Sequence, residues 1–280
     1  MRLKLITLFL FSLILYGCEE KKGNADFIVS ENVVLGNVAL MNNEFESAKV
    51  FYQKAIADNP NDYLALNNLG ELFGLIGIYD SALYFFNESL KVDSLNARTY
   101  NNRAELYEIV HQKKKSLADF NKAIYLDSLF AVAYLNRGEL YLELLKFDSA
   151  MKDYNKAIEI DSLNPIFYNN RGDLKDIKGD KLGAIEDFNR AISLDSTYGF
   201  AYVNRAFSKK LIHDFDAALS DYNKAIEIDS LNPIFYFDRA EIRMEMGDFN
   251  GACEDWMKAR ALGFDIATYH HLINSYCDSI

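Results

Sequence analysis

Few residues of this 280-residue chain are of the types that catalyse reactions or bind metals: it has three cysteines and four histidines. His111 and His213 lie far apart in the sequence, and His270 and His271 are neighbours whose side chains would point different ways on a helix. The chain has no phosphate-binding loop of the form GxxxxGK(S/T), no GxSxG nucleophile motif and no HExxH zinc motif. The sequence therefore predicts no catalytic residue, no metal site and no cofactor, and we expect a protein that is not an enzyme.

Carboxylates, by contrast, are abundant. The chain has 41 Asp and Glu residues against 30 Lys and Arg, which gives a net charge of −11. Nucleic-acid binding needs a basic surface, so we expect no nucleic-acid partner. Half of the residues are hydrophobic and only three are proline. This composition favours a folded chain over a disordered one, and helices over an all-β fold with its frequent Gly- or Pro-containing turns.

A period of 34 residues runs through most of the chain. Residues 153–168 read DYNKAIEIDSLNPIFY, and residues 221–236 read the same, two periods later. Seven units fit end to end without insertion up to Ile266, and they begin at Val29, Tyr63, Ala97, Ala131, Pro165, Gly199 and Pro233. In every unit a small residue occupies positions 8, 20 and 27, and a large aromatic residue occupies position 24. Two helices approach closely only where small residues meet, so each unit is predicted to contain a tight helix crossing.

This spacing resembles the tetratricopeptide repeat, a 34-residue helix-turn-helix unit with small residues at positions 8, 20 and 27 and aromatic residues at positions 4, 11 and 24. The resemblance covers residues 29–266 and implies an all-α fold, a right-handed superhelical solenoid of seven repeats. Leu272, Ile273 and Tyr276 suit one amphipathic helix after the array. We expect residues 267–280 to form this helix and to cap the exposed face of the last repeat.

Positions 7 and 23 change together along the array. They are Leu and Phe in the first two repeats, as in Leu69 and Phe85, and Arg and Asp in the other five. The five pairs are Arg103 and Asp119, Arg137 and Asp153, Arg171 and Asp187, Arg205 and Asp221, and Arg239 and Asp255. The joint change indicates a contact between the two helices of each repeat. A row of ligand-binding arginines is the functional alternative.

In the tetratricopeptide family, positions 2, 5, 9, 12 and 13 form the inner face of the superhelix, which commonly binds an extended peptide or a partner helix. Carried over to this sequence, position 9 is acidic in five repeats, at Glu71, Glu105, Glu139, Asp173 and Glu241. Position 5 provides amides that could bracket a peptide backbone, at Asn67, Asn101 and Asn169. Toward the C-terminal end the inner face becomes apolar, with Phe207 and Phe237 among its residues.

These residues predict the chemistry of the partner. An acidic face with an aromatic end suits a basic or amphipathic segment of a protein or peptide. The alternative is that the acids only solvate an exposed surface.

The start of the chain reads as a targeting segment. An apolar run of eleven residues from Leu5 to Leu15 follows Arg2 and Lys4 and leads to Gly17 and Cys18. This length suits a signal-peptide core and is too short for a transmembrane helix, which needs about 20 residues. The junction resembles the lipobox of bacterial lipoproteins, in which the signal is cleaved before a cysteine that then receives lipid such as palmitate. The alternatives are an ordinary cleaved signal and an uncleaved signal anchor.

The two other cysteines, Cys253 and Cys277, fall on the second helix of the last repeat and on the expected cap helix. Export would place them in a compartment that permits disulfides. A disulfide between them would attach the cap to the array, and two separate buried thiols are the alternative.

The resulting layout is a signal peptide at 1–17, a lipidated Cys18 with a tether to residue 28, seven repeats at 29–266 and a cap helix at 267–280. We expect a non-catalytic, protein-binding scaffold that a lipid holds to a membrane of the bacterial cell envelope, inner or outer. The alternative function is a structural subunit of an envelope complex that binds through its convex face or its ends.

Overall fold

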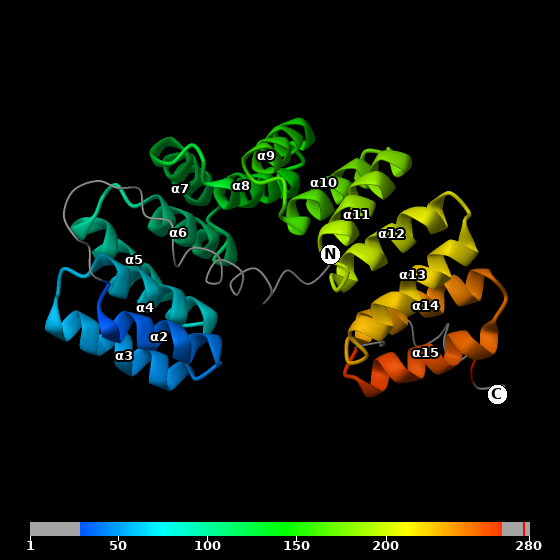
Figure 1. Cartoon of the computed structure of the whole chain (residues 1–280), viewed down its shortest axis with the longest axis horizontal. Helices are drawn as coiled ribbons and strands as arrows, with labels where there is room; N and C mark the ends of the chain where they lie inside the picture. The colour runs from blue at the N-terminus through cyan, green and yellow to red at the C-terminus, as the bar shows by residue number, and fades with distance from the viewer. Residues whose placement is uncertain (1–28, 265–276, 278–280) are drawn as a thin grey trace. The chain divides into compact units, whose positions relative to one another are not determined.

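The computed structural model describes residues 29–264 and Cys277, and the described residues form helices and turns without a strand (Figure 1). Fourteen helices follow one another: α2 (Glu31–Met41), α3 (Phe45–Asp58), α4 (Tyr63–Leu75), α5 (Tyr79–Val92), α6 (Ala97–Ile109), α7 (Lys113–Leu126), α8 (Ala131–Glu143), α9 (Phe147–Ile160), α10 (Pro165–Ile177), α11 (Lys181–Leu194), α12 (Gly199–Leu211), α13 (Phe215–Ile228), α14 (Pro233–Glu245) and α15 (Phe249–Ala261). The predicted signal peptide, Cys18, its tether and the predicted cap helix lie outside the described residues, apart from Cys277. None of the helices in the described ranges is long and apolar enough to cross a membrane.

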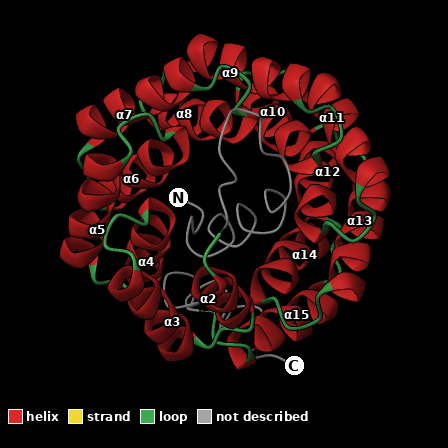
Figure 2. Cartoon of the chain, turned by 60° about the vertical axis from the view of Figure 1, so that its left-hand side comes forward, coloured by secondary structure: helices red, strands yellow, loops and turns green. Residues whose placement is uncertain are grey.

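The helices alternate between the first helix of a repeat, here the A helix, and the second, the B helix. The structure divides into two units, residues 1–144 and 145–280, so that α8 belongs to the first unit and α9 to the second. Within each unit the A helices lie side by side in one layer and the B helices in another (Figure 2). Each A helix after α2 therefore packs against the B helix before it, and within a unit it also contacts the neighbouring A helices.

Local sequence explains where the A helices start. Asn164 and Asn232 precede Pro165 and Pro233, and each Asn side chain accepts a hydrogen bond from a backbone N–H two residues later. Such N-caps satisfy donors that the first helical turn leaves without a partner, and proline is tolerated at that first position. The starts of α10 and α14 are thus marked by capping chemistry as well as by the period.

Helix pairs approach closely where a glycine meets an aromatic ring. A Cβ atom added to Gly70 would lie 2.8 Å from the Phe86 ring, and one added to Gly172 would lie 2.7 Å from the Phe188 ring. Both rings are fully buried. A small residue at position 8 is therefore required because the ring at position 24 already fills the space beside it.

The arginine of position 7 joins three elements at once. Arg103 donates to both carboxylate oxygens of Asp119 at 2.7 and 2.9 Å, and its third nitrogen donates to Asn87 of the preceding repeat at 2.7 Å. Its guanidinium also lies over the ring of Tyr100, 5.4 Å from the centroid. We call this arrangement the arginine clamp, and it recurs at Arg171, Arg205 and Arg239.

The clamp explains why positions 7 and 23 change together along the array. Four arginines contact the aspartate predicted for them, which commits these side chains to packing between helices and excludes a row of ligand-binding arginines there. The fifth pair remains a prediction because Arg137 and Asp153 belong to different units. In the second repeat, Leu69 and Phe85 meet in one hydrophobic cluster instead.

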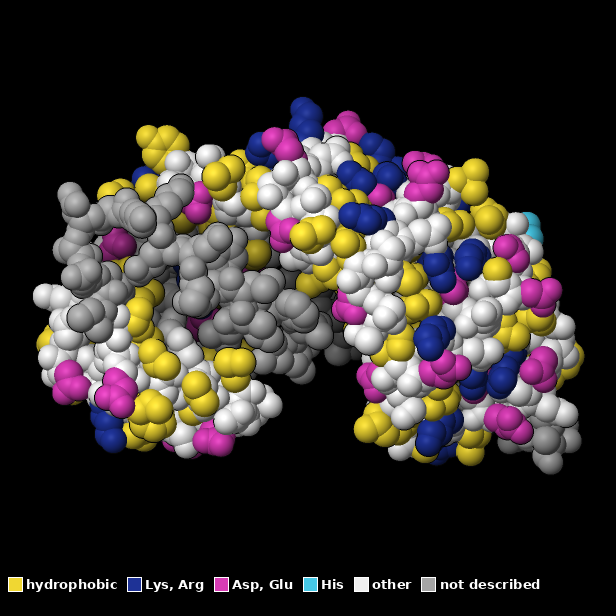
Figure 3. All heavy atoms as spheres, viewed as in Figure 1, with side chains coloured by type: hydrophobic (Ala, Val, Ile, Leu, Met, Phe, Trp, Pro, Cys, Tyr) yellow, Lys and Arg dark blue, Asp and Glu magenta, His cyan; other side chains and the backbone are white. Residues whose placement is uncertain are grey.

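The second unit adds another cation to each clamp. Lys175 lies 2.8 Å from Asp187, Lys209 lies 2.8 Å from Asp221, and Arg243 lies 3.0 Å from Asp255. On the surface over α10 to α15, Figure 3 shows basic side chains interleaved with acidic ones, while the aspartates of the clamps are buried. In the first unit Asp119 has Arg103 alone among the described cations.

The last repeat contains a disulfide between Cys253 of α15 and Cys277. Cys253 is buried beside Trp256, and Cys277 packs against the same hydrophobic cluster. The bond that the sequence left open therefore links the chain beyond the array back to its last helix.

We predict that Arg103→Leu lowers the free energy of unfolding more than Arg171→Leu does. Asp119 would then lie partly buried without a cation, whereas Asp187 would keep Lys175. Removing one partner of such a half-buried pair should cost about 1–3 kcal/mol, less than for a fully buried pair. Urea unfolding measures the difference. The double variant Arg103→Leu/Asp119→Phe, which copies the first two repeats, should recover stability; no recovery would contradict the proposed contact energy.

Candidate functional site

The predicted binding residues all lie on A helices, at positions that share one side of each helix. We call the surface made by positions 2, 5, 9, 12 and 13 the A-face. In the first unit it includes residues of α4, α6 and α8, namely Asn67, Glu71, Asn101, Glu105 and Glu139. In the second unit it includes residues of α10, α12 and α14, namely Asn169, Asp173, Phe207, Phe237 and Glu241.

The asparagines of position 5 contact the next repeat. The amide nitrogens of Asn102, Asn136 and Asn204, all at position 6, donate to the carbonyl oxygens of Asn67, Asn101 and Asn169 at 3.3, 3.1 and 3.0 Å. We call this series the asparagine ladder.

The ladder corrects one expectation. Asn67, Asn101 and Asn169 are almost fully buried, and their carbonyl oxygens accept hydrogen bonds within the array. Buried amides that already have such partners stabilise the packing of neighbouring A helices. They are therefore structural residues and do not bracket a peptide backbone.

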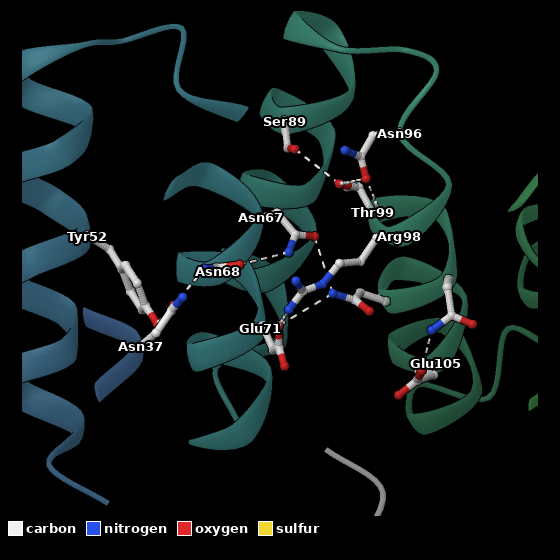
Figure 4. Close-up of polar contacts among 12 residues, drawn as sticks. Asn37, Tyr52, Asn67, Asn68, Glu71, Ser89, Asn96, Arg98, Thr99 and Glu105 are labelled. Carbon is white, nitrogen blue, oxygen red and sulfur yellow. Dashed lines mark hydrogen bonds and ion pairs between the residues drawn. The ribbon is translucent and has the colours of Figure 1, made fainter. Parts of the chain in front are cut away.

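Position 9 belongs to the same network, as Figure 4 shows. Asn136 donates to a carboxylate oxygen of Glu105 at 2.6 Å, and Asn101 donates to the same oxygen at 2.6 Å. Glu71 accepts a longer bond of 3.5 Å from Asn102 and lies 3.5 Å from Arg98. Glu71 and Glu105 therefore already accept hydrogen bonds from ladder asparagines in the absence of a partner.

The first repeat continues this pattern without a carboxylate. Asn37 stands at its position 9 and accepts hydrogen bonds from Asn68 and from the Tyr52 hydroxyl, both at 2.8 Å (Figure 4). Asn37 and Glu105 thus both accept a hydrogen bond from the position 6 asparagine of the next repeat, and Asn37 does so without a negative charge.

The pKa of Glu105 is raised from an ordinary 4.5 to about 8. Burial is the largest cause, the neighbouring carboxylates Glu71, Glu108 and Glu139 act in the same direction, and the hydrogen bond from Asn101 opposes them. Glu105 is therefore mainly protonated and neutral at pH 7. The A-face of the first unit is less negative than its formal count of carboxylates indicates.

In the second unit, two predicted contacts are already used by the protein. Phe237 is buried and lies against Phe264 with ring centroids 4.7 Å apart, so it belongs to the core of the last repeat. Glu241 is partly exposed but lies 3.5 Å from Lys210, which also pairs with Glu245 at 2.9 Å. Phe207 and Asp173 are half-buried.

No group of three or more His, Cys, Asp or Glu residues in the described part of the chain could hold a metal ion. A hollow of about 380 Å³ in the first unit lies beside Ile56, Tyr84 and Phe85, away from the A-face. The geometry offers a surface for recognition, in which half-buried carboxylates and aromatic side chains are set on a rigid polar base.

Sequence reasoning missed two sets of residues. The donors of the ladder stand at position 6, which is Asn in repeats 2 to 6, and the neighbours of the arginine clamp stand at position 25, which is Asn in the same repeats. The position 25 asparagines precede the arginines of repeats 3 to 7 by one repeat each. Comparing positions between neighbouring repeats, as well as within one repeat, would have revealed this relation.

We predict that Glu105→Gln reduces the loss of stability at alkaline pH. A folded-state pKa near 8, against an ordinary value of 4.5, means that stability is greatest while the group is protonated and falls as pH rises from about 4.5 to 8. The glutamine keeps an acceptor for the asparagines and cannot ionise. Urea unfolding at several pH values between 5 and 9 should show the variant gaining on the wild type as pH rises. Parallel curves would contradict it, and Glu254→Gln on the exposed side of α15 is the control.

Comparison with known proteins agrees with the repeat pattern. Models of the tetratricopeptide repeat match residues 51–84, 97–128, 131–162 and 166–198. No curated protein sequence matches the chain significantly.

Solved structures share the fold at low sequence identity. A tetratricopeptide repeat protein from Parabacteroides merdae ATCC 43184 has a TM-score of 0.67 at 22% identity, covering 87% of this chain and 96% of that one. PilF of Pseudomonas aeruginosa has a TM-score of 0.65 at 19% identity, covering 76% and 96%. PilW, a type IV pilus biogenesis factor, has a TM-score of 0.64 at 18% identity, covering 72% and 94%.

These identities show a common fold and do not transfer a partner. Together with the four matched segments and the 34-residue period, they show that the chain is an all-α repeat solenoid and belongs to the tetratricopeptide repeat family.

Proposed function

We propose that this protein is a non-catalytic scaffold whose A-face binds a segment of another protein. The observation that supports this most directly is the construction of that face. Two polar networks hold the A helices: the arginine clamp on the B-helix side and the asparagine ladder at the base of the A-face. A rigid surface presents its side chains without a large entropic cost on binding.

The partner we propose is basic or amphipathic. Glu71 is buried beside Arg98 and Glu105 is mainly neutral, so recognition depends on the half-buried carboxylates Glu139 and Asp173 and on the aromatic side chains of the second unit. Half-buried carboxylates attract Lys or Arg more strongly than fully solvated ones do, because the local dielectric constant is lower. In the second unit Lys210 offsets part of the acidity, and Phe200 and Phe207 suit an apolar part of the segment.

Two variants test the use of the A-face. Glu139→Lys in the first unit and Asp173→Lys in the second should each weaken binding of a labelled Lys- and Leu-containing peptide by about 3–10-fold, the effect of replacing one attractive charge by a repulsive one. Fluorescence anisotropy at two salt concentrations measures this, and the wild type should show the steeper salt dependence. Glu254→Lys, which changes the net charge equally on the exposed side of α15, is the control. An equal loss in the control would assign the binding to net charge and refute the A-face.

We also propose that lipid on Cys18 holds the scaffold to an envelope membrane. The residues between Cys18 and Val29 span at most about 35 Å when fully extended, so the first repeat would lie close to the lipid surface. This places any partner of the A-face within reach of the same membrane.

Replacing the anchor cysteine tests this proposal. Cys18→Ser should move the protein from the membrane fraction to the soluble fraction after cell lysis, because the lipid attaches at the thiol. Immunoblotting of the fractions and the mass of the N-terminal peptide report the change. A wild type without added lipid mass at Cys18 would refute the anchor, as would a Cys18→Ser protein that loses residues 1–17 and still stays in the membrane fraction.

A further inference from the structure

The first helix of the array exposes an apolar row. Val34, Leu35, Val38 and Met41 of α2 keep between 39% and 51% of their accessible surface. Figure 3 shows hydrophobic side chains gathered over α2 and α3. A helix on the surface of a soluble domain normally turns such a row toward a core.

Positions 6, 7 and 10 have a defined task in the other repeats. At position 6, Asn102 and Asn136 bond to the A helix before them, and at position 7, Arg103 bonds to the B helix before it. Position 10 is fully buried in all six later repeats, at Leu72, Leu106, Leu140, Leu174, Ser208 and Ile242. These positions form the stacking face, on which each repeat receives the one before it.

The apolar row of α2 is the stacking face of the first repeat. Val34, Leu35 and Val38 stand at positions 6, 7 and 10, and they are exposed where their counterparts in later repeats are covered. Val34 and Leu35 replace the Asn and Arg that would need a polar partner. The face therefore suits a helix with an apolar stripe that packs as a preceding B helix does. Its stripe would lie on position 10, as Phe86 lies on Leu106 and Phe120 lies on Leu140.

The charges around the stacking face indicate which kind of partner helix could bind there. Glu31 stands exposed at position 3, where later repeats bury small or aromatic residues such as Ala65 and Phe235. Glu44 is also exposed at the other end of α2, and no Lys or Arg occurs in α2 or in the turn after it, whereas Glu46 pairs with Lys49 at 3.6 Å. A second copy of this chain would bring like charges together, whereas a helix flanked by Lys or Arg would be attracted.

We propose that the stacking face of the first repeat, α2 with Val34, Leu35 and Val38 at its centre, binds an amphipathic partner helix whose apolar stripe is flanked by basic residues. The helix lies where a preceding B helix would lie, and one of its basic side chains faces Glu31. In the array, position 27 of a B helix meets position 3 of the next repeat, as Ser89 meets Thr99 at 3.2 Å. The basic residue is therefore expected at the equivalent of position 27. This site is separate from the A-face and does not depend on it.

Two designed helical peptides test the proposal with the purified full-length chain. Both carry leucines at i, i+3, i+4 and i+7, and they differ only in flanking residues, Lys in one and Glu in the other. Isothermal titration calorimetry should show the Lys peptide binding at least about 10-fold more tightly than the Glu peptide. Val34→Ser/Val38→Ser should weaken the Lys peptide by about 10-fold or more, and Glu31→Lys should reduce the preference between the two peptides. These residues are exposed, so their replacement should leave folding intact, which circular dichroism checks.

Two matched variants separate this site from others. Leu163→Ser, at an exposed turn of the second unit, should leave binding of the Lys peptide unchanged. Glu139→Lys weakens only binding at the A-face, so the loss caused by Val34→Ser/Val38→Ser should be the same in its presence. Loss of binding in Glu139→Lys with none in Val34→Ser/Val38→Ser would overturn this inference and support the A-face instead.

Two other occupants of the stacking face would give results that differ from those of a partner helix. A dimer in sedimentation that Val34→Ser/Val38→Ser dissociates would identify a second copy and overturn the proposal. Binding to phosphatidylcholine vesicles that the same variant abolishes would assign the row to a membrane, with the same consequence. Equal affinity for the two peptides, or no binding of either, would also refute it.

Discussion

The interaction on which the array depends is the arginine clamp at position 7. One guanidinium bonds to an aspartate of its own B helix, to an asparagine of the preceding B helix and lies over a tyrosine ring of its own A helix. A planar group with several donors in fixed directions can hold three elements together, which the single ammonium of a lysine cannot do. In the repeats that carry the clamp, directional bonds therefore join neighbouring repeats beside the hydrophobic core, whereas the second repeat has Leu69 and Phe85 in their place.

The asparagine ladder is a second polar network, and the apolar core lies between the ladder and the clamp. The clamp joins B helices to the next A helix, and the ladder joins α4 to α6, α6 to α8 and α10 to α12. Because position 6 donates both to position 5 and to position 9, the ladder uses groups that family resemblance alone assigns to a ligand. The cost of leaving a buried amide without a partner explains why these residues recur together. What remains for recognition is a smaller set of carboxylates and aromatic side chains.

The two ends of the array also depend on how each repeat is covered by a neighbour. The first two repeats lack the clamp and carry Leu and Phe in its place, and the stacking face of the first is apolar. At the other end a disulfide ties Cys277 to α15, beside a core that includes Trp256 and Phe237. A repeat protein must cover both terminal faces or use them, since each repeat is built to be covered by its neighbours. Here the two ends differ in chemistry, which favours different roles for them.

The sequence by itself determined the all-α class, the 34-residue register and the contact between positions 7 and 23. The register and the contact follow from periodicity, because a repeated side chain at a fixed spacing must meet a repeated environment. The all-α class and the positions of the A-face followed from the resemblance to the tetratricopeptide repeat. It could not tell which outward groups bond to a neighbouring repeat, so Asn67, Asn101, Asn169 and Phe237 were assigned to a ligand.

Only the tertiary structure decided those assignments and the protonation of Glu105. Both depend on distances between residues about 31 to 35 positions apart and on how much water reaches them. Signal cleavage and the lipid on Cys18 involve residues outside the described part of the chain, and they remain predictions from the sequence.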